Sequence, residues 1–478
     1  MAKRALVVAF ALVAVACSAS DRDAALKSPA TAARTAAVVG HERSTVLALL
    51  SGGARTALAR LDARTLRPIG RRIEVGGGGS HAFSPNRRTL VVASAVVSGP
   101  SAERGRSQLS FVDVRTMRRK GQLELRASGL VGAILWSEPG RLVVLLDDPP
   151  RVVAVTTRPL RASSAKGLQG RVAAADAKAG RLVLLLAPAR SIGPSRLAVV
   201  ESDGRARTVA LREILSGWEP VESRRDPYAM RQWIPGLAVS PDAARAVVVP
   251  AGDRVADVDL DSLRVSYHEL SERVSLFRRV SSWLEPEAEA KTVEGPDRFA
   301  RWVGEDQVAV TGMSYFRLRR GDSGASRAGL RLIDTRDWSV RMLAKQAAGM
   351  IVVRDLVLAY AWAQAEGNEG IGLRAYGLGG EERFHLFGNK PVDWVEAAFP
   401  YAYVPRDGGE RFKVVDLRSG RVVARPKPGL SVSIVEPGVR RRGSSQGFVS
   451  AQGFVAGVRV RSCIRAVPQC RECDDSRR

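Results

Sequence analysis

Cysteine and histidine are scarce in this chain, and each shortage excludes a class of protein. Four cysteines in 478 residues cannot build the disulfide-dense scaffold of a small secreted domain. The four histidines, His41, His81, His268 and His385, stand at no metal-ligand spacing from one another. A histidine-based metal centre would therefore need ligands from separate parts of the fold. We expect no metal and no cofactor.

Catalytic motifs are also missing, and the partial matches fail on their context. Gly443–Gly447 spells G-x-S-x-G, but β-prone residues follow it where a nucleophile elbow needs a helix. His268 and Glu269 resemble the start of a zinc-protease helix, yet Glu272 occupies the place of the second histidine. The cluster Gly76–Gly79 fits neither the dinucleotide-binding nor the P-loop spacing. The sequence predicts no catalytic residue.

Negative charge is in short supply. Lys and Arg number 74 against 49 Asp and Glu, a net charge of +25. Arginine binds phosphate and carboxylate groups bidentately, so anionic polymers or lipid headgroups of a cell envelope are conceivable partners. The arginines are nevertheless scattered through turns, and only Arg440–Arg442 forms a run. This scatter, together with the export signal below, argues against nucleic acid as a partner.

The N-terminus has the composition of an export signal. The apolar run Ala5–Ala16 follows two basic residues and is too short to span a bilayer, which takes about 20 helical residues. Small residues then lead into Cys17, which predicts a lipoprotein-type signal over residues 1–17 with Cys17 lipidated at the outer face of the cell membrane. The alternative is an ordinary secretion signal with an incidental cysteine. Residues 18–36 suit a flexible tether.

The rest of the chain repeats one unit. Its clearest copy, Gly236–Leu270, holds four short β-prone runs separated by turn formers: Leu237–Ser240, Ala246–Val249, Val255–Asp259 and Arg264–Glu269. Nearly continuous apolar strands recur in the other units, and such runs suit strands that are covered on both faces. Regular spacing of four-stranded units predicts a radially repeated all-β fold.

Most units share an acidic residue at the end of a strand, followed three positions later by Thr, Ser or Asp. The acidic residues are Asp62, Asp113, Asp259, Asp334 and Asp416. A carboxylate in this place accepts hydrogen bonds from backbone N–H groups two or three residues further on. We therefore interpret these residues as turn formers and not as catalytic pairs.

With these units and the Pro-containing turns Ser84–Asn86 and Ser240–Asp242, the chain resembles bacterial exported β-propellers of the WD40-like and lactonase-like type. The resemblance covers roughly residues 40–436. It implies four-stranded blades and no particular activity, because propellers host binding proteins and enzymes alike. The chain lacks the Gly-His and Trp-Asp marks of eukaryotic WD40 repeats and the Trp-docking repeats of quinone-cofactor propellers.

We expect a propeller of seven or eight blades over residues 37–436, with a short helical insertion. Eight units can be counted, but the unit around Asp62 and the segment Leu430–Glu436 could share a blade to close the ring. Two insertions, 212–235 and 271–298, interrupt the rhythm.

Both insertions carry aromatic residues among charges. Residues 274–284 repeat apolar side chains at helical spacing before Pro286, which predicts an amphipathic helix. Since connections between blades lie on one face of a propeller, both insertions could cover one rim. The predicted binding rim consists of Trp218, Tyr228, Trp233, Phe277 and Trp283. The alternative is that the helix only packs on the blades beneath it.

Residues 437–478 form a basic tail with Cys463, Cys470 and Cys473. In an exported chain a disulfide is the default, and Cys463 could pair with either of the other two. A tail with reactive thiols and a Cys-x-x-Cys metal or redox site are the alternatives.

The leading hypothesis is a monomeric, envelope-tethered propeller that binds a protein or envelope ligand without catalysis. The alternative is an extracytoplasmic hydrolase or lyase with its site in the central channel. Acidic and histidine side chains gathered near the axis, including His81 or His268, would favour the enzyme. A third interpretation makes the positive surface a clamp for anionic wall polymers.

Overall fold

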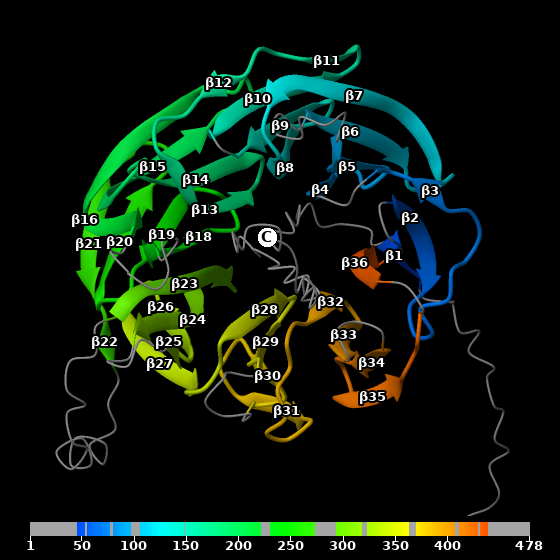
Figure 1. Ribbon diagram of the computed structural model, residues 1–478. Helices are drawn as coiled ribbons and strands as arrows, with labels where there is room; N and C mark the ends of the chain where they lie inside the picture. The colour runs from blue at the N-terminus through cyan, green and yellow to red at the C-terminus, as the bar shows by residue number, and fades with distance from the viewer. Residues whose placement is uncertain are drawn as a thin grey trace, which may run out of the picture. The chain divides into compact units, whose positions relative to one another are not determined.

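The computed structural model describes residues 45–52, 55–76, 80–96, 106–147, 149–220, 230–272, 293–317, 323–362, 370–406, 411–428 and 431–437. The elements of these residues are β-strands, with no helix among them. No segment in these ranges forms a helix able to cross a membrane. The strands make eight sheets arranged in a ring, an eight-bladed propeller (Figure 1), which excludes the seven-bladed alternative.

The first four blades follow one another along the chain, apart from one strand of blade 1. Blade 1 contains β36 (Ser431–Pro437), β1 (Thr45–Gly52), β2 (Arg55–Asp62) and β3 (Ile73–Glu74). Blade 2 contains β4 (His81–Phe83), β5 (Thr89–Val96), β6 (Arg106–Asp113) and β7 (Arg118–Ser128). Blade 3 contains β8 (Val131–Glu138), β9 (Arg141–Leu146), β10 (Arg151–Thr157), β11 (Leu160–Ala162) and β12 (Lys166–Gly167). Blade 4 contains β13 (Arg171–Lys178), β14 (Arg181–Ala187), β15 (Ile192–Val200), β16 (Ala206–Pro220) and β17 (Met230–Trp233).

The other four blades complete the ring. Blade 5 contains β18 (Gly236–Val239), β19 (Arg245–Val249), β20 (Arg254–Asp259) and β21 (Val265–Glu269). Blade 6 contains β22 (Ser271–Glu272), β23 (Val293–Val303), β24 (Gln307–Arg317), β25 (Ser323–Arg327), β26 (Leu330–Asp334) and β27 (Ser339–Ala344). Blade 7 contains β28 (Gly349–Val353), β29 (Leu356–Tyr360), β30 (Leu373–Gly377) and β31 (Glu382–Leu386). Blade 8 contains β32 (Glu396–Ala398), β33 (Tyr401–Arg406), β34 (Arg411–Asp416) and β35 (Arg421–Ala424).

Blade 1 closes the ring with strands from opposite ends of the described chain. Strand β36 pairs antiparallel with β1, from Val46 opposite Pro437 to Ser51 opposite Ser431. The expectation that the Asp62 unit shares a blade with the segment near residue 430 is confirmed. The ring keeps eight blades because this blade takes β1, β2 and β3 from the N-terminal side.

The apolar core lies between the blades. Eight clusters of buried apolar residues each join two neighbouring sheets. In β14, Leu182 and Leu184 pack toward blade 3 while Val183 and Leu185 pack toward blade 5. Because side chains alternate between the two faces of a strand, a strand covered on both faces is apolar at every position. This explains the continuous apolar runs in the sequence.

The acidic residues at the strand ends form the expected turns. Asp62 Oδ1 accepts hydrogen bonds from the backbone N–H of Arg64 and Thr65, at 3.1 and 2.8 Å. Asp259 Oδ1 binds the N–H of Asp261 and Ser262 in the same way, at 3.1 and 2.7 Å. Asp113, Asp334 and Asp416 accept matching backbone bonds. The interpretation as turn formers is confirmed.

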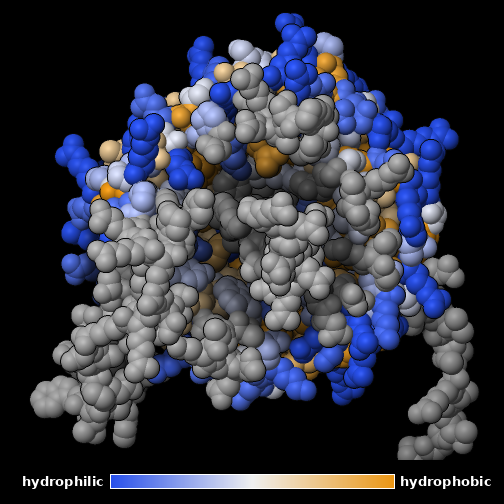
Figure 2. Space-filling model, in the orientation of Figure 1, coloured by the Kyte–Doolittle hydropathy of each residue, from blue (hydrophilic) through white to orange (hydrophobic). Residues whose placement is uncertain are grey.

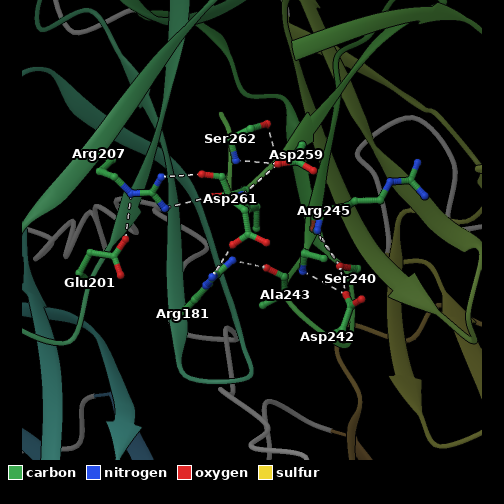
Figure 3. A network of polar contacts seen from close by, with 12 residues as sticks. Arg181, Glu201, Arg207, Ser240, Asp242, Ala243, Arg245, Asp259, Asp261 and Ser262 are labelled. Carbon is green, nitrogen blue, oxygen red and sulfur yellow. Dashed lines mark hydrogen bonds and ion pairs between the residues drawn. The ribbon is translucent and has the colours of Figure 1, made fainter. Parts of the chain in front are cut away.

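Polar side chains dominate the periphery of the face seen in Figure 2. Many of the arginines join blades. Arg181 of blade 4 donates to the Ala243 carbonyl at 3.0 Å and to Asp261 at 2.6 Å, both in turns of blade 5 (Figure 3). Arg207 donates to the Leu260 and Asp261 carbonyls at 3.1 and 2.9 Å. Part of the arginine excess therefore serves the fold.

Two buried carboxylates secure the inner strands. Asp176 in β13 accepts the Val239 N–H of the next blade at 2.9 Å. Glu396 in β32 accepts the Ile434 N–H of the closing strand at 2.6 Å and the Ser433 hydroxyl at 3.1 Å. Burial raises the pKa of Glu396 to about 7, against the hydrogen bonds, which favour the ionised form.

The stability of the ring should depend on the protonation of Glu396. Its pKa is higher in the folded chain (about 7) than the ordinary value of 4.5 for a glutamate, so the folded state binds the proton more tightly and stability falls as pH rises through this window. The loss is at most about 3 kcal/mol between pH 5 and 8. Glu396→Gln keeps an oxygen for Ile434 and cannot ionise. In urea denaturation at pH 5 and pH 8, the free energy of unfolding of the wild type should fall at pH 8 while that of the variant does not. The same change with pH in both proteins would contradict this.

Tyr403 links blade 8 to blade 1 through a buried hydrogen bond from its hydroxyl to the Ala63 carbonyl at 3.0 Å. Tyr403→Phe leaves that carbonyl without its donor, which should lower the free energy of unfolding by about 1–3 kcal/mol. Tyr401→Phe, on the same strand, is the matched control and should change stability by less than about 0.5 kcal/mol. Equal effects in urea denaturation would refute the assignment.

Candidate functional site

The described ends of the first insertion continue blade 4. Strand β16 extends to Pro220 and pairs with β15 on one side and with β17 on the other. Residues 212–214 have no partner in β15, since Leu211 faces Ser195 and Leu215 faces Pro194. Beyond this bulge the three strands form a ribbon, which we call the β15–β17 ribbon.

The register of the ribbon separates the two described tryptophans of the predicted rim. Gly217 lies opposite Trp233, and Trp218 lies opposite Gln232. Residues directly opposite each other share a face, whereas consecutive residues point to opposite faces. Trp218 and Trp233 therefore lie on different faces of the ribbon and do not form one surface, which corrects the prediction of a common rim for these two residues.

Trp218 serves the core. Its ring packs against the apolar cluster between blades 4 and 5, and the Arg171 guanidinium lies 4.6 Å from the ring centroid. A cation over an indole face adds roughly 0.5–2 kcal/mol to such packing. Trp218 is thus a structural residue.

The face that carries Trp233 is apolar. Along it lie Ile192, Pro194, Leu215 and Trp233, because Ile192 pairs with Gly217 and Pro194 with Leu215. We call these four residues the ribbon face. Leu215 is 37% exposed, one of three large apolar side chains exposed in the described ranges. Gly217, at the centre, has φ +136°, and a Cβ there would meet the Ser191 carbonyl oxygen.

The Glu219–Arg231 pair ends the ribbon face. The two residues lie opposite each other, two positions along the strands from Gly217 and Trp233 and therefore on the same face. Their carboxylate and guanidinium lie 2.9 Å apart. The ribbon face therefore offers an apolar strip with a charged tip.

The ribbon is tied to blade 6. The Ile234 N–H donates to the Pro296 carbonyl at 2.9 Å, and the Arg298 N–H donates to the Ile234 carbonyl at 2.8 Å. The long strands β23 and β24 continue this connection. The ribbon thus continues the sheet of blade 4 and is fixed to blade 6 through β23, so it can present its face without rearranging.

Asp297, at this junction, is an acidic residue with a raised pKa. Burial raises its pKa to about 6, against the opposing charge of Arg298. The neighbouring Arg298 donates to the Met313 carbonyl at 2.6 Å and to the Ser314 hydroxyl at 3.1 Å. Burial and the charge of Asp297 raise the pKa of Tyr315. A carboxyl that titrates near neutral pH can exchange protons.

The histidines do not gather with acidic groups. His268 lies on the outermost strand of blade 5, where it stacks on Trp338 with ring centroids 4.2 Å apart, so it does not contribute to a group near the axis. His81 lies on the innermost strand of blade 2 and is half-buried. Within the described ranges, no three His, Cys, Asp or Glu residues form a metal-binding group.

Several predicted site residues lie outside the described residues. They are Cys17, Tyr228, Phe277, Trp283, Cys463, Cys470 and Cys473, and the predicted helix over residues 274–284 lies there too. Sequence reasoning missed Ile192, Pro194 and Leu215. Ile192 and Pro194 belong to the β-prone run that ends at Val200, and Leu215 belongs to the first insertion. Their pairing depends on a bulge that no local pattern marks.

Comparison with known proteins shows the fold alone. No protein-family model matches the chain, and no curated protein matches its sequence. The dihydro-heme d1 dehydrogenase NirN in complex with DHE is 16% identical, over 82% of this chain and 74% of that one, with a TM-score of 0.52. Apo AztD from Citrobacter koseri is 11% identical over 85% of this chain and 99% of that one, with a TM-score of 0.47. BamB from Moraxella catarrhalis is 12% identical over 75% of this chain and 92% of that one, with a TM-score of 0.40. The resemblance to bacterial propellers is confirmed at the level of the fold.

The two tryptophans should respond differently to truncation. Trp218→Ala removes a ring from the core and should lower the free energy of unfolding by about 2–4 kcal/mol. Trp233→Ala, on the ribbon face and outside the described core clusters, should cost less than about 1 kcal/mol. Urea denaturation of both variants distinguishes the roles, and a larger loss for Trp233→Ala would contradict them.

Proposed function

We propose that this protein is an exported, membrane-tethered propeller that binds a protein partner through the ribbon face, without catalysis. The observation that carries the proposal is the apolar strip of Ile192, Pro194, Leu215 and Trp233 on a ribbon that extends blade 4 and is fixed to blade 6. Exposed apolar side chains next to a charged tip are typical of protein-binding surfaces. The partner would supply an apolar patch with a polar rim.

The tether is the second part of the proposal. Composition supports it: the basic and apolar residues before Cys17 are typical of a lipoprotein-type signal, and the small, polar residues 18–36 are typical of a tether. A lipid at Cys17 would keep the propeller at the outer face of the membrane, where an envelope protein is the expected partner.

Site-specific photo-crosslinking tests the binding surface. A photo-crosslinking amino acid at Leu215 should give one discrete adduct in cells that express the full chain, and adding Trp233→Ala should reduce the adduct at least about fivefold. The control position is Leu130, which is 57% exposed between blades 2 and 3 and should give no such adduct. Equal adducts at both positions, or an adduct insensitive to Trp233→Ala, would refute the assignment of the surface.

Fractionation tests the tether in the same cells. The wild type should sediment with membranes and carry a lipid mass, while Cys17→Ala should be soluble and unlipidated. Two soluble, unlipidated proteins would refute the tether and leave the ribbon face untouched.

A hydrolase or lyase is the second candidate function, and Asp297 is the observation that favours it. Its carboxyl titrates near pH 6 beside Arg298 and Tyr315, as a general acid or base requires. A hydrolytic activity that is lost in Asp297→Asn, with the fold retained, would replace the binding function.

A further inference from the structure

A group of unpaired cations lies on the side of blade 8 that faces blade 7. In β33 and β34, Val404 lies opposite Lys413, and Arg406 lies two residues beyond Val404 on the same face. Val404 belongs to the apolar cluster between blades 7 and 8. Arg406 and Lys413 therefore stand at the end of this interface, next to the chain that connects the two blades.

The aromatic ring of Phe387, which follows the last strand of blade 7, lies next to both cations. The Lys413 ammonium lies 4.3 Å from the ring centroid of Phe387, and the Arg406 guanidinium carbon lies 5.4 Å from it. The loop after Phe387 is fixed, because the Lys390 N–H donates to the Phe387 carbonyl at 3.2 Å and the Lys390 carbonyl accepts from Gly372 at 3.1 Å. Lys390 is exposed on this loop.

The charges in this corner repel one another. Burial lowers the pKa of Lys413, and the charges of Arg406, Arg425 and Lys390 lower it further. We call Lys390, Arg406, Lys413 and Arg425 the blade 8 cation cluster. None of the four forms an ion pair within the described part of the chain. Within the described ranges, the cluster thus carries positive charge that no carboxylate pairs with.

Arg406 has one edge without acceptors. Its Nη1 donates to the Pro391 carbonyl at 3.3 Å, whereas Nε and Nη2 are buried and have no hydrogen-bond partner among the described residues. These two nitrogens form the edge with which arginine grips two oxygens of a phosphate or carboxylate. Buried donors in proteins are rarely left unpaired, so this two-nitrogen edge is a candidate to bind a pair of anionic oxygens.

We propose that the blade 8 cation cluster binds the phosphoryl group of an anionic ligand. Nε and Nη2 of Arg406 donate to two of its oxygens, and Lys413, Lys390 and Arg425 balance its charge. A phosphate monoester is favoured over a carboxylate because four cations match a dianion better than a single negative charge. Because Nε and Nη2 are buried, neighbouring side chains must move before an anion can reach them. The phosphoryl group can come from a soluble ester or from a lipid headgroup.

Calorimetric titration tests this site with inorganic phosphate as the probe, on the full chain carrying Cys17→Ser, at pH 7.5 and constant ionic strength. The parent should bind one phosphate saturably. Arg406→Lys keeps the charge without the two-nitrogen edge and should weaken binding at least about tenfold; Lys413→Gln should weaken it at least about fivefold. The matched control is Arg421→Gln, an exposed arginine of the same blade, which should change affinity less than about twofold.

Vesicle sedimentation separates the two sources. Binding to phosphatidic acid vesicles that is absent with phosphatidylcholine and reversed by phosphate indicates a lipid headgroup; phosphate binding without vesicle binding indicates a soluble ester.

The proposal is overturned if phosphate does not bind saturably, if acetate binds as tightly, or if Arg406→Lys and Lys413→Gln bind like Arg421→Gln. Thermal melts of each variant confirm that affinity losses do not reflect unfolding. Because the ribbon face is unaltered, these outcomes are independent of the proposed binding function.

Discussion

Closure of the ring is the constraint on which the rest of the structure depends. Each blade buries apolar residues against both neighbours, so a missing blade would expose two interfaces at once. Antiparallel pairing of β36 with β1 removes that gap by joining opposite ends of the described chain. Glu396 and Tyr403 of blade 8 reinforce the closure from the side, through Ile434 and the Ala63 carbonyl.

The excess of arginine divides into two uses. Arg181 and Arg207 donate to turns of the neighbouring blade, where a fork of donors can reach carbonyl and carboxylate oxygens together. Arg406 instead has two buried nitrogens that meet no acceptor among the described residues. Arginine thus joins blades 4 and 5 through hydrogen bonds, whereas Arg406, between blades 7 and 8, has unpaired donor nitrogens within the described residues. Net charge alone would not distinguish these roles.

The repeat and its turns could be predicted from sequence because their causes are local. The four runs expected within residues 236–270 agree with β18 to β21 to within one residue, since strand alternation and Asx-turns depend on neighbouring residues. That segments from both ends of the repeat would share blade 1 could be predicted because a radial repeat must close on itself.

The candidate surfaces could not be predicted, because they depend on contacts between distant segments. Trp218 and Trp233 look equivalent as aromatic residues of one insertion, and only the register of β16 with β17 assigns them to opposite faces. The bulge at residues 212–214 decides that Leu215 joins Trp233. The free edge of Arg406 likewise depends on Phe387 and Pro391, which come from the connection between two blades.

Hydrogen exchange of the full chain tests the central claim, that β36 closes an eight-bladed ring. The amides of β36 that pair with β1 should exchange as slowly as those of the inner blade strands, because closure makes their opening part of a larger unfolding event. Rapid exchange in β36, with slow exchange in β1 and β2, would show that the ring is held without its closing strand and would contradict the account.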